Sequence, residues 1–105
     1  MREADFQTRF INKLSFIYPD CLILKNDSGY QQGIPDWSFF YGDFWAWFEI
    51  KRAPAAQRQP NQEYFIEWAD RCSFGAFVTP ENEEEVLRDL QLALRSRSRR
   101  RPRVS

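Results

Sequence analysis

Histidine is absent from the 105-residue chain, and cysteine occurs only at Cys21 and Cys72. Without histidine the chain cannot build a catalytic triad in which an imidazole carries the proton. It also lacks the set of nitrogen and sulfur donors that zinc sites require, because two isolated cysteines cannot complete one. The cysteines are likewise too few for a disulfide framework, so we interpret them as reduced core thiols of a cytoplasmic protein.

Other features are missing as well. No apolar run is long enough to span a membrane, and neither a phosphate-binding loop nor a Gly-rich dinucleotide turn is present. The N-terminal residues are polar and helical in pattern, so we expect no signal peptide. These absences predict a protein with no membrane partner and no organic cofactor. The length permits one compact domain, and ten Phe, four Trp and four Tyr supply its aromatic core.

The net charge of zero conceals an uneven distribution along the chain. Residues 1–94 hold 9 basic and 15 acidic side chains, a net charge of −6, whereas residues 95–105 hold six arginines and no acid. We therefore expect a folded domain over 1–94 and a disordered basic tail over 95–105, suited to a phosphate backbone. A solubilising or cloning-derived end is the alternative explanation of the tail. The candidate nucleic-acid-binding residues are Lys25, Arg52, Arg58, Arg99, Arg100 and Arg101.

The centre of the chain predicts a β-hairpin. Two apolar runs, Trp37–Tyr41 and Phe44–Ile50, flank Gly42-Asp43, a pair suited to a two-residue turn. With that turn, facing residues carry numbers that sum to 85, so Asp36 is expected directly opposite Glu49. The hairpin therefore brings two carboxylates together at its open end.

Lys51 follows two residues after Glu49, so both side chains are expected on the same face. Two carboxylates that face each other repel unless a proton, a cation or a metal lies between them. Such hard oxygen ligands suit Mg²⁺ or Mn²⁺. A lysine beside them can orient or deprotonate a water, or stabilise the charge of a phosphoryl transition state. Together these residues predict metal-assisted phosphodiester hydrolysis.

Hydrophobic periodicity predicts three helices and four strands. The helices are expected from Glu3 to Ile17, after Asn61 as N-cap, and after Thr79 as N-cap with Pro80 at the first helical position. Short apolar runs at 21–25 and 74–79 supply the two strands outside the hairpin. The resulting order, αβββαβα, predicts an α/β fold with a mixed central sheet flanked by helices.

Two further polar residues fall on otherwise apolar helix faces. Glu3 is aligned with Phe6 and Phe10, and Gln62 occupies the equivalent place on the second helix. Both are candidates for the site, but each also has a purely structural explanation. Glu3 would favour the helix dipole in the first turn, and Gln62 would cap the first turn of its helix.

Pro35-Asp36, a twelve-residue spacer and Glu49-Ile50-Lys51 together resemble the PD-(D/E)xK motif of the restriction-endonuclease-like nucleases. With Gly33-Ile34, Glu3 and Gln62, the chain is similar to one branch of them, the virus-type replication–repair (VRR-NUC) nucleases and the related phage Holliday-junction-resolving enzymes. The resemblance extends over residues 3–79. It implies a restriction-endonuclease-like core and a Mg²⁺-dependent DNA endonuclease, with Mn²⁺ able to replace Mg²⁺.

The resemblance also implies which residues hold the metal. Asp36 and Glu49 would be ligands, together with the backbone carbonyl of Ile50. Glu3 would complete the metal site directly or through water. The expected substrate is a Holliday junction or other branched DNA, and the expected setting is DNA repair in a bacterial or phage-infected cell.

For catalysis, the resemblance implies that Lys51 positions or activates the attacking water and that Gln62 orients Lys51 or the scissile phosphate. One small domain cuts one strand, so we expect a homodimer for cleavage of paired strands. A non-catalytic nucleic-acid-binding or assembly module that retains the fold is the alternative, and the same chemistry on RNA is a third possibility. The charges alone would also fit a structural ion pair between Lys51 and Glu49 or Asp36.

Overall fold

The computed structural model describes residues 2–100 and confirms the predicted order of elements. The helices are α1 (Glu3–Ile17), α2 (Gln62–Cys72) and α3 (Glu83–Arg100). The strands are β1 (Leu22–Lys25), β2 (Trp37–Tyr41), β3 (Phe44–Ile50) and β4 (Gly75–Val78). Along the chain they follow as αβββαβα, so the predicted α/β class is confirmed. Within residues 2–100, none of the helices combines the length and the apolar character needed to cross a membrane.

The four strands form one mixed sheet in the order β1-β2-β3-β4. β2 is antiparallel to both β1 and β3, whereas β4 pairs parallel with β3 after the α2 crossover. The hairpin register is the predicted one, since Trp37 pairs with Phe48 and Tyr41 with Phe44. Gly42 has a φ of 63° in the turn, a conformation that glycine adopts at little cost because it has no Cβ.

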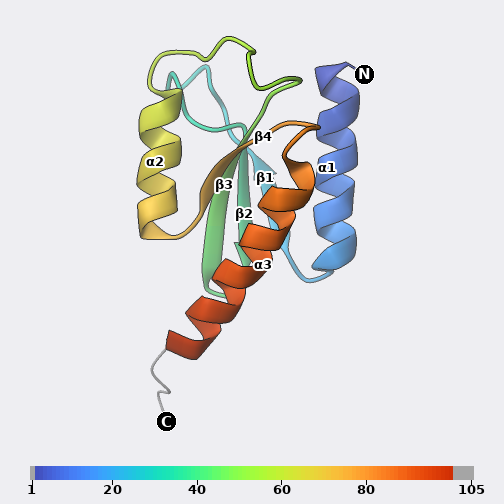
Figure 1. The fold of residues 1–105 in the computed structure, drawn as a ribbon. Helices are drawn as coiled ribbons and strands as arrows, with labels where there is room; N and C mark the ends of the chain where they lie inside the picture. Colours follow the sequence, from blue (N-terminus) through green and yellow to red (C-terminus); the bar gives the residue numbers. More distant parts are fainter. Residues whose placement is uncertain (1, 101–105) are drawn as a thin grey trace.

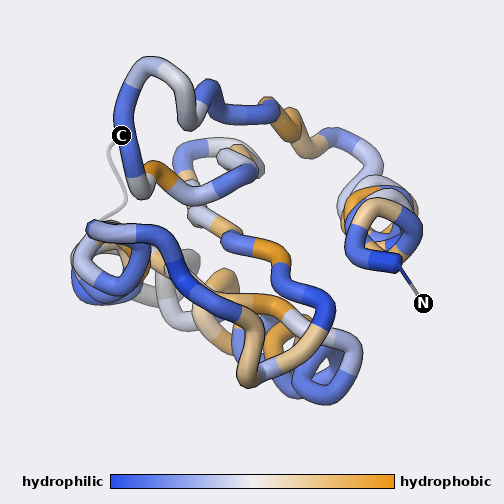
Figure 2. Tube along the Cα trace, turned by 90° about the horizontal axis from the view of Figure 1, so that it is seen from above, coloured by the Kyte–Doolittle hydropathy of each residue, from blue (hydrophilic) through white to orange (hydrophobic). Residues whose placement is uncertain are grey.

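Helices α1 and α3 cover one face of the sheet, and α2 covers part of the other (Figure 1). On the first face, Phe10 of α1 meets Phe48 of β3 edge to face, with 5.4 Å between ring centroids. Seen from above, the trace in the middle of the molecule includes hydrophobic stretches, and the helices around it mix hydrophobic and hydrophilic residues (Figure 2). The side chains of this core without exposed surface are Phe6, Phe10, Leu14, Phe39, Ala46, Phe48, Ile50, Val78 and Leu90.

The second face of the sheet is only partly covered, because α2 lies over β3 and β4. Trp45 and Trp47 of β3 contact Trp68 of α2, with ring centroids 5.7 and 5.6 Å apart. Over β1 and β2 this face stays open to solvent. We call its exposed side chains the β1–β2 patch: Leu22, Leu24 and Phe40, which are 54%, 47% and 38% exposed.

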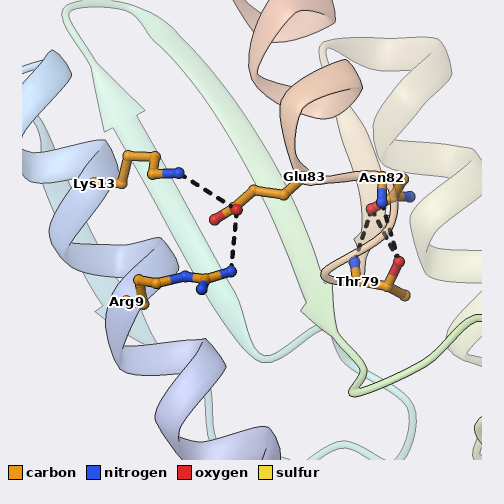
Figure 3. Close-up of polar contacts among 5 residues, drawn as sticks. All are labelled: Arg9, Lys13, Thr79, Asn82 and Glu83. Atoms are coloured by element: carbon orange, nitrogen blue, oxygen red, sulfur yellow. Dashed lines mark hydrogen bonds and ion pairs between the residues drawn. The ribbon is translucent and has the colours of Figure 1, made fainter. Parts of the chain in front are cut away.

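Helix α3 begins at Glu83, later than the start predicted directly after Thr79. Thr79 and Asn82 instead close a turn: Asn82 Oδ1 accepts the Thr79 backbone N–H at 2.7 Å, and Thr79 Oγ1 accepts the Asn82 N–H at 3.3 Å (Figure 3). These two hydrogen bonds satisfy the backbone N–H groups of both Thr79 and Asn82, whereas a Thr N-cap alone would leave the Thr79 N–H without a partner in this turn. Glu83 is buried, and its Oε1 lies 3.3 Å from both Arg9 and Lys13, which ties α3 to α1 (Figure 3).

The basic tail predicted to be disordered from residue 95 is helical as far as Arg100, so that prediction was wrong for residues 95–100. Arginine is a good helix former, and positive charge near a helix C-terminus interacts favourably with the helix dipole. The arginines therefore prolong α3 instead of ending it. Residues 101–105, including Arg101, lie outside the described residues.

Candidate active site

A cavity of about 380 Å³ opens at the end of the sheet where β3 ends and α2 begins. Its lining includes all five side chains for which the sequence predicts a catalytic role: Glu3, Asp36, Glu49, Lys51 and Gln62. Glu3 comes from α1, Gln62 from α2 and Glu49 from β3. Asp36 directly precedes β2, and Lys51 directly follows β3. The fold thus gathers at one place residues that are far apart in the sequence.

Asp36 and Glu49 are held together by the backbone of the strands that carry them. The Asp36 N–H donates to Glu49 Oε1 at 3.1 Å, and the Ile50 N–H donates to Asp36 Oδ2 at 3.2 Å. Each carboxylate therefore accepts a backbone hydrogen bond from the neighbouring strand. The two residues lie opposite each other, as the hairpin register predicts.

Glu49 is only 3% exposed, and its burial raises its pKa from 4.5 to about 7. The negative charge of Asp36 adds to this shift, and the positive charge of Lys51 opposes it in part. A hydrogen bond to the Asp36 side chain further favours the protonated form of Glu49. At Glu49, burial and the charge of Asp36 thus outweigh the attraction of Lys51, so the protonated form of this carboxyl is favoured.

Lys51 lies beside the pair and is 12% exposed. Its Nζ is 3.6 Å from Glu49 Oε2 and donates to the backbone carbonyl of Gln57 at 3.1 Å. Its backbone N–H donates to Val78 O at 2.9 Å, which extends the pairing of β3 with β4 and fixes the start of the side chain. The ion pair between Lys51 and Glu49, predicted from the charges alone, is therefore present. The same geometry places an ammonium group where it can reach a substrate at the carboxylates.

Gln62 and Glu3 line the cavity in different ways. Gln62 is buried at the start of α2, and its Oε1 accepts the Gln59 N–H at 2.8 Å. This bond holds the loop before α2 and does not cap the first turn of the helix, which differs from the structural explanation given from sequence. Glu3 is exposed, and only the first turn of α1 reaches the cavity because α1 packs on the opposite face of the sheet from α2. In the part of the chain that the structure describes, neither side chain forms a hydrogen bond with the carboxylate pair.

The donor chemistry at the cavity fits a hard divalent cation. Asp36 and Glu49 offer carboxylate oxygens. The charge of Asp36 helps to raise the pKa of Glu49, so the two carboxylates repel each other, and a cation between them would reduce that repulsion. No three His, Cys, Asp or Glu side chains within residues 2–100 form a group that could hold a metal ion, so Glu3 is not grouped with Asp36 and Glu49 as a direct ligand. Glu3 lines the same cavity, and a contact of Glu3 to a metal through water stays a prediction.

Two of the predicted nucleic-acid-binding residues are neighbours of residues that line the cavity, one in space and one in the sequence. Lys25 lies at the cavity rim, with Nζ 3.7 Å from Asp36 Oδ1 and 5.0 Å from the centroid of the Trp37 ring. Arg52 is exposed and directly follows Lys51. Each carboxylate thus has a lysine beside it, Lys25 at Asp36 and Lys51 at Glu49.

The other predicted basic residues are elsewhere. Arg58 forms an ion pair with Glu63, with 2.6 Å between NH1 and Oε1. Arg99 and Arg100 belong to the last turn of α3. This helix of 18 residues starts at the cavity end of the sheet and runs about 27 Å towards the hairpin turn (Figure 1). The role of these arginines in binding nucleic acid stays a prediction.

Comparisons with models of known protein families, with curated proteins and with solved structures give no match for this chain. The resemblance to PD-(D/E)xK nucleases stays a prediction from the sequence. The chemistry proposed for the protein therefore depends on the geometry of this cavity.

Asn26 is a residue of the site that the sequence did not single out. Its backbone N–H donates to Asp36 O at 2.8 Å, and its side chain donates to Pro35 O at 2.8 Å. Its Oδ1 accepts from Ser38 Oγ at 3.0 Å, and Ser38 Oγ accepts from Trp47 Nε1 at 3.0 Å. These bonds anchor the chain where it enters β2 and so position Asp36. The signal in the sequence was Ser38, a hydroxyl in an apolar strand opposite a tryptophan.

Gly33 is the point at which the loop before β2 meets the loop before α2. It has a φ of +88°, and a Cβ there would overlap the carbonyl oxygen of Pro60 and lie 2.6 Å from Asn61 Cβ. We expect Gly33→Ala to lower the free energy of unfolding by about 3 kcal/mol, since it adds both backbone strain and a clash. Urea unfolding measures this change.

Gly42→Ala is the matched control. Gly42 also has a positive φ, of 63°, but a Cβ there would meet no atom within 4 Å. Replacement of Gly42 by alanine should therefore lower the free energy of unfolding through backbone strain alone, by about 1 kcal/mol. Equal losses in the two variants would mean that the two loops do not meet closely at Gly33.

Proposed function

We propose that the protein is a metal-dependent DNA endonuclease that hydrolyses phosphodiester bonds and prefers branched DNA. The observation that supports this proposal is a carboxylate pair, of which Glu49 is buried and Asp36 is partly exposed, beside a lysine in a cavity also lined by Glu3 and Gln62. Phosphodiester hydrolysis needs a group that activates water and positive charge that stabilises the transition state. Asp36, Glu49 and Lys51 supply both when a divalent cation is bound.

Asp36, Glu49 and the backbone carbonyl of Ile50 would hold Mg²⁺, which Mn²⁺ would replace. When bound, the ion would polarise a phosphoryl oxygen and lower the pKa of a bound water. Glu49 must lose its proton to serve as a ligand, so cation binding should strengthen as the pH rises towards 8. The backbone donors on Asp36 and Glu49 keep both carboxylates oriented without using all their oxygen lone pairs.

Lys51 would hold the attacking water or the scissile phosphate. Its ammonium group has three donors, of which one bonds Gln57 O and one points to Glu49. A third donor is left for substrate. Gln62, fixed by the Gln59 N–H, would keep the opposite wall in place, and Lys25 at the rim would attract the phosphate backbone.

DNA is the partner we propose, because the cavity with Lys25 and Arg52 beside it suits a phosphodiester backbone. Arg99 and Arg100 would meet DNA only beyond the cleavage site, given their place at the far end of α3. The compartment we propose is the cytoplasm, where the free thiols of Cys21 and Cys72 would stay reduced.

Calorimetric titration with Mn²⁺ tests whether the carboxylate pair binds a cation. We expect binding by the wild-type protein at pH 8 and at least a roughly tenfold weaker affinity for Asp36→Asn, because one of two charged ligands is lost. Asp89→Asn, an exposed residue of α3, is the matched control and should bind as the wild type does. Equal affinities for wild type and Asp36→Asn would contradict a metal site at this pair.

A non-catalytic nucleic-acid-binding module is the second candidate, favoured by the ion pair of Lys51 with Glu49 and by the place of Glu3 away from the pair. Such a module would use these charges for stability alone. It predicts that a four-way junction binds equally well in EDTA and in Mg²⁺ and is never cut.

We propose a homodimer in which a second copy covers the β1–β2 patch. The patch is apolar, extends to the half-exposed Trp68, and lies on the same sheet face as Glu49. One chain carries one cavity, so two copies related by a two-fold axis would supply the two sites needed to cut paired strands. Such an axis brings the same patch of each copy together.

Sedimentation of Leu24→Glu tests this proposal. A charge placed on the patch should lower the association constant by at least about tenfold, since it would be desolvated in the interface. Leu92→Glu is the matched control, because Leu92 is a similarly exposed leucine on α3. A wild-type protein that stays monomeric, or two variants that weaken association equally, would contradict the patch as the interface.

A further inference from the structure

A second cavity, of about 240 Å³, lies beside the candidate active site. Lys51 lines both cavities, so its side chain forms the wall between them. The rest of the second cavity comes from the loop after β3, including Ala53, Pro54 and Arg58, and from Phe77 of β4. A group bound there would be the immediate neighbour of a phosphate bound at Lys51.

Arg58 forms the most distinctive surface of this cavity. Its guanidinium carbon lies 3.8 Å from the centroid of the Phe77 ring, so one face of the guanidinium group rests on the ring. The ion pair with Glu63 holds the guanidinium group of Arg58 at its NH1 atom. The Arg58 side chain is nevertheless 39% exposed. Phe77 and Glu63 therefore hold the guanidinium group in place, while more than a third of the Arg58 side chain stays accessible to a further ring.

The chemistry of the cavity favours an uncharged planar group over a second phosphate. Glu63 already offsets the charge of Arg58, and Glu81 adds a negative charge to the lining. Ala53 and Pro54 supply apolar contacts. Nucleobases stack on arginine planes and on aromatic rings, irrespective of their sequence, because every base has a π-face.

We propose that this second cavity binds an unstacked nucleobase of the nucleotide next to the scissile phosphate, with the base on the outer face of Arg58. The proposal rests on the proposed nuclease function, since it places the phosphate at Lys51. A base inside a continuous duplex is stacked between its neighbours, and extruding it costs a few kcal/mol. A nucleotide at a branch point or in a single-stranded arm avoids that cost. The cavity thus gives a physical reason for a preference for branched DNA.

The test uses the full chain carrying Asp36→Asn, which prevents cutting. It compares how tightly this protein binds two fluorescein-labelled DNAs, a splayed-arm duplex and a continuous duplex of the same sequence. Arg58→Lys in this background keeps the charge but removes the stacking plane. We expect it to weaken splayed-arm binding roughly tenfold and duplex binding by less than about twofold. Arg71→Lys, the same substitution at an exposed position near the far end of α2, is the matched control and should change neither.

A second readout follows the base directly. A fluorescent adenine analogue in the arm next to the branch should be quenched when it stacks in the cavity, and Arg58→Lys should abolish the quenching. Quenching that persists in Arg58→Lys, or equal weakening of both DNAs, would overturn the stacking site.

Cutting by the chain without Asp36→Asn, measured in parallel, separates the two proposals. Cutting without Arg58-dependent binding would leave the nuclease function standing and remove the stacking site. Arg58-dependent binding without cutting would leave the stacking site standing and remove the nuclease function.

Discussion

Replacing Lys51 with methionine is expected to lower the rate of DNA cleavage by a factor of about 10²–10⁴, the range typical of a lost proton-transfer or charge-stabilising group. Methionine has a similar length but neither charge nor donors. Loss of the ammonium group removes both the contact to Glu49 and the donor left for substrate. Single-turnover cleavage of a labelled branched DNA measures the effect.

The same variant separates catalysis from structure. Removing a positive charge 3.6 Å from Glu49 should leave Mn²⁺ binding as tight as in the wild type or make it tighter, because the cation then meets less repulsion. Lys51→Arg retains the charge and is the matched control for stability. A Lys51→Met protein that cuts at the wild-type rate would show that Lys51 serves only as the partner of Glu49.

Glu49 makes the stability of the metal-free protein depend on pH. In the unfolded chain this carboxyl ionises near 4.5, whereas in the folded protein its pKa is about 7. Between these values the folded state binds more protons at Glu49, so the contribution of this group to stability is largest below about pH 4.5 and is lost as the pH rises through 7. The loss amounts to about 3 kcal/mol for the whole shift. Glu49→Gln should remove this decline.

Urea unfolding in EDTA between about pH 5 and pH 8 measures the difference between wild type and Glu49→Gln. Glu67→Gln, an exposed residue of α2, is the matched control and should keep the wild-type pH dependence. A wild-type protein whose stability rises over this pH interval relative to Glu49→Gln would contradict a raised pKa at Glu49.

The hairpin and the carboxylate pair could be predicted from sequence because they follow from local rules. A two-residue turn at Gly42 and strict alternation along two apolar strands fix the register, and register alone puts Asp36 opposite Glu49. The inward place of Gln62 followed from helical periodicity in the same way. These predictions required no knowledge of how distant segments meet.

The contacts between loops could not be predicted in this way. Gln57 holds Lys51, Gln59 holds Gln62, and Asn26 positions Asp36, yet each lies in an irregular segment without periodicity. The stacking of Arg58 on Phe77 also depends on the parallel crossover that brings β4 beside β3. The reach of α1 into the cavity was only partly predictable, since periodicity gives the face of Glu3 but not its distance from the carboxylates.

The extent of the C-terminal helix was misjudged for a different reason. A run of like charges suggested disorder, but a helix whose earlier turns are packed on the sheet continues through good helix formers at little cost. This extension matters for function, because it carries Arg99 and Arg100 away from the cavity.

The measurement that bears most directly on nuclease activity is a gel assay of purified protein on a synthetic four-way junction and a matched linear duplex. It is run at low salt with Mg²⁺, with Mn²⁺ and with EDTA, and with Asp36→Asn in parallel. We expect the wild type to cut in either metal but not in EDTA, to cut the junction faster than the duplex, and Asp36→Asn to cut neither. A junction that is bound in EDTA and left intact in both metals would contradict the nuclease and support the binding module.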